Sequence, residues 1–187
     1  MNQKQLDLFS RVVEVATRAH ESQKRKGNGL PYITHPFTVA ILLLKADCED
    51  EVVMAGLLHD TIEDTDLTYE ELQAQFGVRV ASIVKECSEQ DKSKSWEERK
   101  QSTLRNLETI SIEACMVVCA DKLHNIRSTA QEFAQKGDAI WDVFNRGKDK
   151  QEWYYRGIIQ ALEKRLPEFP LYQLLQHEVE SLFKKMI

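Results

Sequence analysis

The sequence contains few residues that interrupt helices, with seven glycines and four prolines among its 187 residues. This scarcity argues against a disordered or linker-rich protein. No run approaches the roughly 18 consecutive apolar residues that a membrane-spanning helix requires. Residues 1–20 contain no apolar signal-peptide core followed by a small-residue cleavage site, so we expect a cytoplasmic location.

Cysteine is also scarce, and its spacing excludes the common zinc-binding patterns. The four cysteines form no Cys-x-x-Cys pair. Cys115 and Cys119 lie one helical turn apart within an apolar run. We therefore expect reduced core cysteines and no structural zinc site.

The remaining composition is that of a globular protein. Hydrophobic residues make up 42% of the chain, which is enough for a sizeable core. No internal repeat and no convincing domain boundary is present. The sequence therefore predicts one domain spanning residues 1–187.

The spacing of apolar residues is helical through nearly the whole chain. Leu8, Phe9, Val12 and Ala16 recur at three- and four-residue steps, which predicts an amphipathic helix over about residues 5–23. Pro36 can open a second helix, because the first turn of a helix does not use the N–H that proline lacks. Further helices are expected over residues 50–60, 68–76, 78–88, 95–110, 111–134, 138–145, 148–166 and 170–186. Since no segment has the pattern of a β-hairpin or a βαβ unit, the sequence predicts an all-α bundle of about eight to ten helices.

Capping residues support several of these helix starts. Thr68 followed by Glu71 is a capping box, and Ser111 is an expected N-cap. The polar segment 89–95, "EQDKSKS", is predicted to be a mobile loop and a candidate lid.

Histidine and aspartate follow apolar or aromatic stretches at three places. "YITHP" contains His35, "GLLHDTIEDT" contains His59 and Asp60, and "CMVVCAD" contains Asp121. A single such residue is usually a core or helix-end residue. Together they can form a mixed nitrogen and oxygen site for Mn²⁺, Fe²⁺, Co²⁺ or Zn²⁺, and the high carboxylate content favours Mn²⁺. Spacing alone leaves the metal site and the purely structural reading equally open.

Three segments resemble the signatures of a known family. In order and spacing, "HESQKRKGNGLPYITHP", "LLHDTIEDT" and "CADKLHNIRS" are similar to those of the HD-domain alarmone hydrolases, the hydrolase half of the Rel/SpoT enzymes and the stand-alone small alarmone hydrolases. The resemblance covers about residues 16–129. It implies an all-α HD domain with one Mn²⁺ per chain, held by His35, His59, Asp60 and Asp121.

The resemblance also implies a role for the acidic pair that follows the His-Asp motif. In the family, the residues that match Glu63 and Asp64 position or deprotonate the attacking water. Each lies four residues after a candidate ligand, so in a helical turn both face the metal. The alternative is a solvated acidic turn that caps the next segment.

The implied substrate is a small purine nucleotide with a 3′-pyrophosphate, (p)ppGpp or (p)ppApp, and neither nucleic acid nor a membrane is an expected partner. Because the formal net charge is −5, positive charge must be concentrated near the site to bind so anionic a molecule. By the resemblance Arg25 stacks on the purine, which a planar guanidinium does well. Lys26 beside it can contact phosphate as a compact charge. Stacking tolerates both purines, so the sequence favours neither, and the oligomeric state stays open.

Four more residues are candidates for substrate binding. Lys122 and Arg127 flank the Asp121 motif, and Asn125 matches a nucleoside contact of the family. Tyr154 or Tyr155 corresponds to a nucleotide-contacting tyrosine of single-domain members, and Tyr154 is the candidate chosen, although packing of a C-terminal helix explains both tyrosines equally well. His124 is expected to pack or to form a structural hydrogen bond.

Two other functions remain open. The first is an HD phosphohydrolase that acts on another nucleotide, such as a nucleoside phosphate or NADPH. The second is a non-catalytic alarmone-binding module, although no candidate metal ligand has been lost. A cyclic-dinucleotide phosphodiesterase is disfavoured, because no Gly-Tyr-Pro motif follows the His-Asp pair.

Overall fold

The structure is a computed structural model, and it describes residues 3–26, 29–89, 91–143 and 146–184. Within these ranges every regular element is helical, which confirms the all-α prediction, and the only β feature is an isolated bridge between Lys24 and Pro31. The elements in chain order are α1 (Gln3–Ala19), α2 (Thr34–Lys45), α3 (Asp50–Leu58), α4 (Thr61–Asp64), α5 (Tyr69–Phe76), α6 (Val78–Cys87), α7 (Trp96–Asn106), α8 (Ile112–Lys136), the 3₁₀ helix η1 (Gly137–Val143), α9 (Gly147–Glu163) and α10 (Pro170–Leu182).

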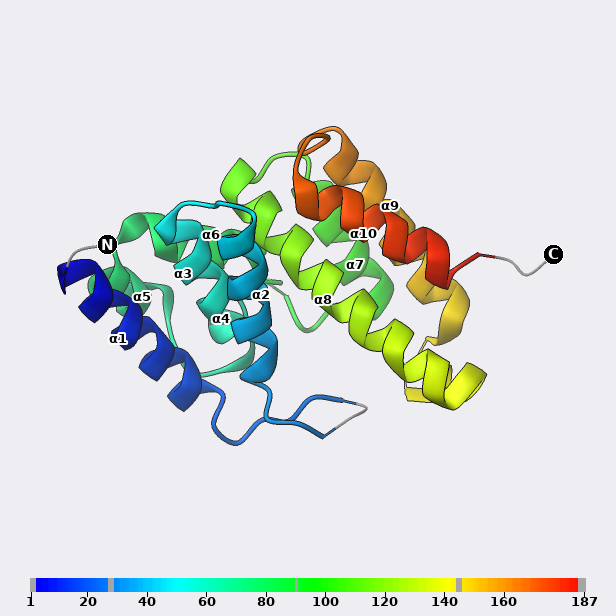
Figure 1. Cartoon of the computed structure of the whole chain (residues 1–187), viewed down its shortest axis with the longest axis horizontal. Helices are drawn as coiled ribbons and strands as arrows, with labels where there is room; N and C mark the ends of the chain where they lie inside the picture. The colour runs from blue at the N-terminus through cyan, green and yellow to red at the C-terminus, as the bar shows by residue number, and fades with distance from the viewer. Residues whose placement is uncertain (1–2, 27–28, 90, 144–145, 185–187) are drawn as a thin grey trace.

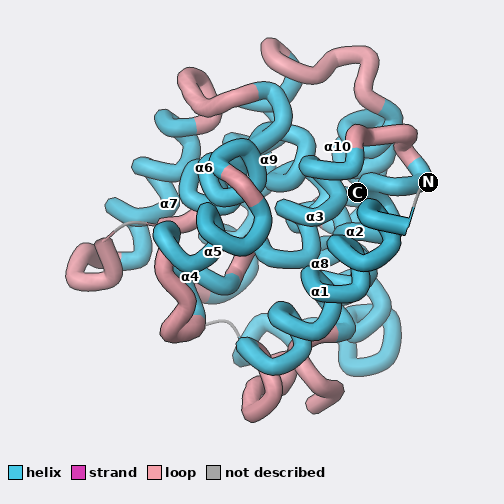
Figure 2. The backbone as a smooth tube through the Cα atoms, turned by 90° about the vertical axis from the view of Figure 1, so that its left-hand side faces the viewer, coloured by secondary structure: helices cyan, strands magenta, loops and turns pink. Residues whose placement is uncertain are grey.

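Helix α8 is the longest helix and runs through the middle of the bundle. Helices α2, α3 and α6 pack against one part of it, and α9 and α10 pack against another (Figure 1). Its buried face carries Val117, Leu123 and Ile126, each fully inaccessible, and small residues such as Cys119 and Ala120 that let neighbouring helices approach closely. A tube view turned by 90° shows that helices make up most of the molecule and that the longer loops lie at its edges (Figure 2).

Helix α3 is buried on nearly all sides. Residues 52–58 are all buried, because α1, α2, α6 and α8 contact this short helix. A helix enclosed in this way shows no polar face, which explains its continuous apolar sequence. The enclosure also fixes the position of His59, the residue directly after α3.

Several helix boundaries differ from the predicted ones. Helix α2 begins at Thr34, two residues before Pro36, but Pro36 is still in the first turn, where its missing N–H is not needed. The predicted helix 138–145 is a 3₁₀ helix over Gly137–Val143. Its first residue, Gly137, is also the C-cap of α8 and has a positive φ of 60°, a conformation that ends α8 there. The last residues of two predicted helices, 144–145 and 185–186, lie outside the described residues.

The predicted caps are confirmed. Thr68 and Glu71 form a capping box at α5, and the Ser111 side chain accepts a hydrogen bond from the backbone N–H of Ala114 at α8. No helix in the described parts of the chain combines the length and apolar character needed to cross a membrane.

Replacing Gly56 should destabilise the contact between α2 and α3. A Cβ atom at Gly56 would lie 2.5 Å from Cδ1 of Leu43 and 3.4 Å from Cγ1 of Val39, and both side chains are fully buried. We expect Gly56→Val to lower the free energy of unfolding by about 1–3 kcal/mol through overpacking, measured by urea denaturation. Ala74→Val, at an exposed position of α5, controls for β-branching in a helix and should have a much smaller effect.

Candidate metal centre and adjoining cleft

The structure brings the four predicted metal ligands together from distant parts of the chain. His35 lies in the first turn of α2, His59 and Asp60 join α3 to α4, and Asp121 lies in the middle of α8. Ligand atoms of His35, His59 and Asp121 all lie within 4.8 Å of one another. Asp60 adjoins this group, with Oδ2 at 2.9 Å from Nε2 of His59 and 3.7 Å from Nε2 of His35.

Both imidazoles are oriented by hydrogen bonds on their Nδ1 side. His59 Nδ1 lies 2.9 Å from the carbonyl oxygen of Gly56, so Nδ1–H donates to it and Nε2 faces the two carboxylates. This Nε2 is buried, 2.9 Å from Oδ2 of Asp60 and 3.9 Å from Oδ1 of Asp121. His35 Nδ1 lies 2.6 Å from Nδ1 of His124. The Nε2 atoms of the two rings and the nearby carboxylate oxygens form a set of donor atoms that fits a divalent metal ion. The hydrogen bonds at Nδ1 fix the orientation of each ring.

The two carboxylates are also held in place. Asp60 Oδ2 accepts a 2.6 Å hydrogen bond from Tyr32 Oη. Asp121 Oδ1 accepts a 2.5 Å hydrogen bond from Asn125 Nδ2, and its Oδ2 lies 2.7 Å from Nζ of Lys122. These contacts compensate two negative charges that burial would otherwise penalise.

The electrostatics of the cluster favour cations. Burial tends to raise the pKa of Asp60 and Asp121, but His59 beside the first and Lys122 beside the second outweigh burial and lower both pKa values. Burial tends to lower the pKa of His59, but the carboxylate of Asp60 outweighs it and raises this pKa to about 9. The field that favours a proton on His59 equally favours a divalent cation. Burial, followed by repulsion from His35, lowers the pKa of His124 to about 4, so His124 is neutral at pH 7.

The two residues of the acidic pair occupy different positions. Glu63 lines the cavity at the cluster, and its Oε2 accepts a 2.8 Å hydrogen bond from the backbone N–H of Glu89. Burial raises the pKa of Glu63 above its ordinary value. Asp64 lines a neighbouring cleft and pairs with Lys92 at 2.9 Å. The segment predicted as a lid thus contacts both acidic residues, although Gln90 within it lies outside the described residues.

Two adjoining spaces make up the site. A cavity of about 180 Å³ contains the cluster, and a cleft of about 640 Å³ lies beside it. The two spaces share five lining residues, Tyr32, Lys100, Lys122, Asn125 and Tyr154. A molecule in the cleft can therefore extend a group into the cavity.

The cleft is basic although the chain is acidic. Its lining includes five cationic side chains, Lys24, Arg25, Lys26, Lys100 and Lys122. Positive charge is therefore concentrated at the cleft. An acidic chain with a net charge of −5 needs such a local concentration in order to bind an anionic ligand.

The structure places five of the six predicted substrate-binding residues at the cleft, namely Arg25, Lys26, Lys122, Asn125 and Tyr154. The guanidinium of Arg25 donates a 2.9 Å hydrogen bond to Asn125 Oδ1. Tyr154 is only 4% exposed, and its hydroxyl has no hydrogen-bond partner among the described residues. A buried hydroxyl without a partner at a cleft is suited to a ligand contact.

Arg127 is not brought to the cleft. It is about half exposed and pairs with Glu178 of α10 at 3.1 Å. The reason is helical rotation: at about 100° per residue, position 127 points away from the face of α8 that carries Asp121 and Asn125.

Sequence reasoning missed several residues of the site. Tyr32, three residues before His35, was within the recognised motif but was not singled out. Lys100 and Trp96 of α7 line the cleft. Glu89 forms ion pairs with Arg99 at 2.7 Å and with Lys100 at 2.5 Å. No local pattern marked these residues, because only packing of α7 brings them to the cleft.

The fold and the cluster define the class, an all-α protein with a buried His/Asp centre suited to a divalent metal. The sequence profile of the HD domain matches residues 12–149, and the chain belongs to the HD-domain family.

Named relatives are consistent with this assignment. The chain is 42% identical over 130 residues to the guanosine-3′,5′-bis(diphosphate) 3′-pyrophosphohydrolase MESH1 of Danio rerio, covering 68% of this chain and 72% of that protein. It is 41% identical over 183 residues to the guanosine-3′,5′-bis(diphosphate) 3′-pyrophosphohydrolase of Haemophilus influenzae, covering 92% of this chain but only 26% of that protein.

A solved structure supports the same family. The metazoan ortholog of SpoT that hydrolyses ppGpp superposes with a TM-score of 0.76 at 26% identity, covering 94% of both chains. The resemblance to alarmone hydrolases is thus confirmed.

Removing the Asp121 carboxylate should abolish metal binding. We expect purified Asp121→Ala to contain only background divalent metal by elemental analysis, whereas Asp138→Ala, an exposed change in η1, should retain the wild-type content. Because Lys122 loses its partner, circular dichroism melting must show that the variant is folded; His59→Ala provides a second test that leaves this ion pair intact. Full metal occupancy in both folded variants would contradict the assignment.

Proposed function

We propose that residues 1–187 form one HD domain that acts as a Mn²⁺-dependent 3′-pyrophosphohydrolase of (p)ppGpp or (p)ppApp. The products would be the purine nucleotide and pyrophosphate. The observation that carries the proposal is the buried His/Asp cluster, whose cavity shares five lining residues with a basic cleft. The similarity to proteins named as ppGpp 3′-pyrophosphohydrolases supports the same substrate class.

His35, His59, Asp60 and Asp121 would hold the metal. A bound divalent ion supplies Lewis-acid stabilisation of phosphate charge and makes nearby water more acidic. Two imidazoles and two carboxylates suit manganese, since carboxylate-rich sites favour it and the cluster contains no thiolate ligand.

Glu63 is the proposed general base. It lines the cavity, and the backbone N–H of Glu89 fixes its carboxylate at 2.8 Å. In the proposed step a water oxygen bonds to the phosphorus attached to the ribose 3′-oxygen while Glu63 accepts a proton from that water. The bond between phosphorus and the 3′-oxygen breaks, and the 3′-oxygen leaves as a hydroxyl after taking up a proton. Burial of Glu63, which raises its pKa, makes it a stronger base for this transfer.

Lys100, Lys122 and Tyr154 are the proposed contacts to the pyrophosphate. All three line both the cavity and the cleft, so they lie at the boundary between the metal and the nucleoside. The ammonium groups lie near the Tyr154 ring, Lys100 at 5.0 Å and Lys122 at 5.8 Å from its centroid. Cations and a hydroxyl donor at this boundary can stabilise the negative charge on the phosphate oxygens as water attacks and the 3′-oxygen leaves.

Arg25 and Lys26 are the proposed contacts to the nucleoside. Arg25 donates a 2.9 Å hydrogen bond to Asn125 and lies 5.9 Å from the ring centroid of Tyr32. These two contacts fix the orientation of its planar guanidinium group at the cleft. Such a plane can stack on a purine, and Lys26 at the rim can bind a 5′-phosphate.

The test of the function is a product assay on purified protein with Mn²⁺. We expect pyrophosphate from ppGpp or ppApp and no orthophosphate from NADPH. Orthophosphate from NADPH without any pyrophosphate from the alarmones would establish the alternative phosphohydrolase instead.

Exchanging the acidic pair for its amides should separate binding from turnover. Glu63→Gln with Asp64→Asn retains the shape but removes the base and two negative charges, so turnover should fall about 10²- to 10⁴-fold while metal content and nucleotide binding persist. Calorimetric titration with the nucleotide and a pyrophosphate-release assay measure the two effects.

The matched control is Asp66→Asn with Glu70→Gln, which makes the same charge change at exposed positions nearby. Near wild-type hydrolysis by the Glu63/Asp64 variant would show that the pair is only a solvated turn.

Removing the Arg25 side chain should weaken substrate binding more than it slows chemistry. Base stacking is the same in the ground state and the transition state, so Arg25→Ala should raise KM far more than it lowers kcat. Steady-state kinetics check this, with Arg18→Ala on the exposed face of α1 as the control. An unchanged KM would place the base elsewhere.

A further inference from the structure

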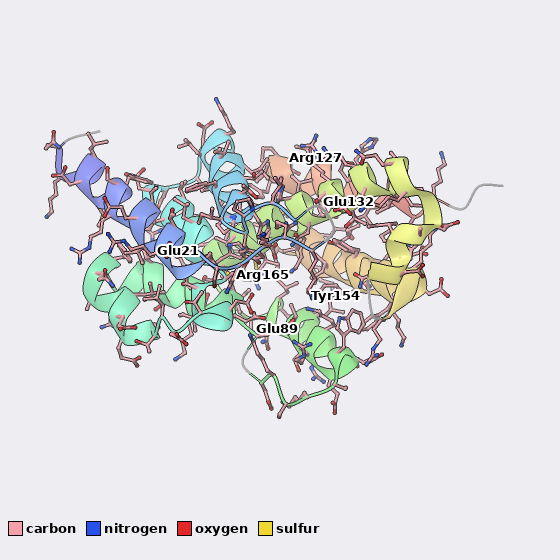
Figure 3. The ribbon with its side chains drawn as sticks, turned by 90° about the horizontal axis from the view of Figure 1, so that it is seen from below. Glu21, Glu89, Arg127, Glu132, Tyr154 and Arg165 are labelled. Carbon is pink, nitrogen blue, oxygen red and sulfur yellow. The ribbon has the colours of Figure 1, made fainter. Side chains whose placement is uncertain are left out.

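One face of α8 forms a floor that runs from the metal centre along the cleft. Asp121 lies at the cavity, and Asn125, Ser128, Thr129 and Glu132 line the cleft at steps of three and four residues. At about 3.6 residues per turn, Glu132 is three turns beyond Asp121 on the same face. Figure 3 labels Glu132, which comes from α8, and Tyr154, which comes from α9. Glu132 therefore marks the end of the cleft that is distant from the metal centre.

A carboxylate in this cleft requires an explanation. Among the described residues that line the cleft, five are cationic and two are acidic, Asp64 and Glu132. Asp64 is paired with Lys92 at 2.9 Å. A second carboxylate would repel every phosphate of a polyanionic substrate in contact with it, whereas it would attract a neutral part of the ligand that donates hydrogen bonds.

An ordinary surface ion pair does not account for Glu132. Its Oε2 lies 2.9 Å from Nζ of Lys136, one turn further along α8. The two side chains are unequally exposed, however, Glu132 at 13% and Lys136 at 42%. A solvated pair would leave both groups in water and contribute little. An ionised carboxylate has about four acceptor positions, so the bond to Lys136 does not exhaust the capacity of Glu132.

We propose that Glu132 recognises the Watson–Crick edge of guanine and makes this chain prefer guanine over adenine alarmones. The proposal rests on the proposed function, because that function places a purine in this cleft. Guanine presents two adjacent donors, N1–H and the 2-amino group, which match the acceptors of a carboxylate. Adenine presents one donor, its 6-amino group, beside the N1 lone pair, which a carboxylate repels.

The length of the cleft agrees with this assignment. The phosphorus under attack must lie at the cavity, so the nucleoside extends from Asp121 towards Glu132. Eleven residues of helix span about 16 Å, and a glutamate side chain leans back towards the helix N-terminus, which shortens the gap. The remaining distance is comparable to that from a 3′-phosphorus to the far edge of its purine. Lys24 and Lys26, which also line the cleft, can bind the phosphates on the 5′ side.

The test compares ppGpp and ppApp with the wild-type protein and with Glu132→Gln, both loaded with Mn²⁺. The wild type should hydrolyse ppGpp with a kcat/KM at least about tenfold above that for ppApp. A glutamine offers one acceptor and one donor, which match the 6-amino group and N1 of adenine. The substitution should therefore change the guanine-to-adenine ratio by about 10- to 100-fold in favour of adenine, as expected for a lost bidentate contact.

Lys136→Gln is the matched control. It removes the ion pair on α8 and leaves the carboxylate, so the base preference should remain that of the wild type. Thermal melting of both variants confirms that they are folded. An equal loss of kcat/KM with ppGpp and ppApp in Glu132→Gln, which leaves the guanine-to-adenine ratio unchanged, overturns the proposal. A shift of this ratio in Lys136→Gln as large as that in Glu132→Gln also overturns it.

Binding measurements separate this proposal from the proposed function. Calorimetry with GDP and ADP reports base preference without any turnover. If the wild type releases no pyrophosphate from either alarmone, the hydrolase assignment fails, and the binding data still decide the role of Glu132. Tighter binding of GDP that is lost in Glu132→Gln supports that role, and equal binding of GDP and ADP by the wild type overturns it.

Discussion

The burial of two carboxylates beside two imidazoles in the centre of the bundle is the constraint on which the rest of the structure depends. Such charges are unfavourable in an apolar interior unless each finds a partner. Here Lys122 and Asn125 hold Asp121, Tyr32 holds Asp60, and the Nε2 atom of His59 faces Oδ2 of Asp60 at 2.9 Å. Two carboxylates and two imidazoles held close together in this way suit a divalent cation, and the surrounding helices keep the four side chains in one place.

The apolar packing supplies the rigidity that this arrangement needs. Helix α3 is enclosed by four other helices, and Gly56 within it permits the close approach of α2 through Leu43 and Val39. The same Gly56 offers its carbonyl oxygen to Nδ1 of His59. One residue thus contributes to helix packing and to the orientation of a candidate ligand, so the core and the metal centre cannot vary independently.

The segment that joins α6 to α7, together with α7 itself, positions several charged side chains at the site. Glu89 is largely buried, and its carboxylate binds Arg99 and Lys100 while its backbone N–H binds Glu63. The position of the proposed base is therefore linked to the position of the cations that would receive the pyrophosphate. A chain with a net charge of −5 can bind a polyanion in this way, because five cationic side chains are gathered along one cleft.

The sequence by itself determined the helical class and the position of most helices, since these depend on apolar spacing and on caps such as Thr68 and Ser111, which act within a few residues. It also identified the cluster, because His59 and Asp60 directly follow a buried helix and resemble a known motif. Tertiary structure alone decided which residues line the cleft: Lys100 and Glu132 enter it, and Arg127 does not. The physical reason is that helix spacing is a local property, whereas the cleft depends on how α7, α8 and α9 pack, which no short stretch of sequence encodes.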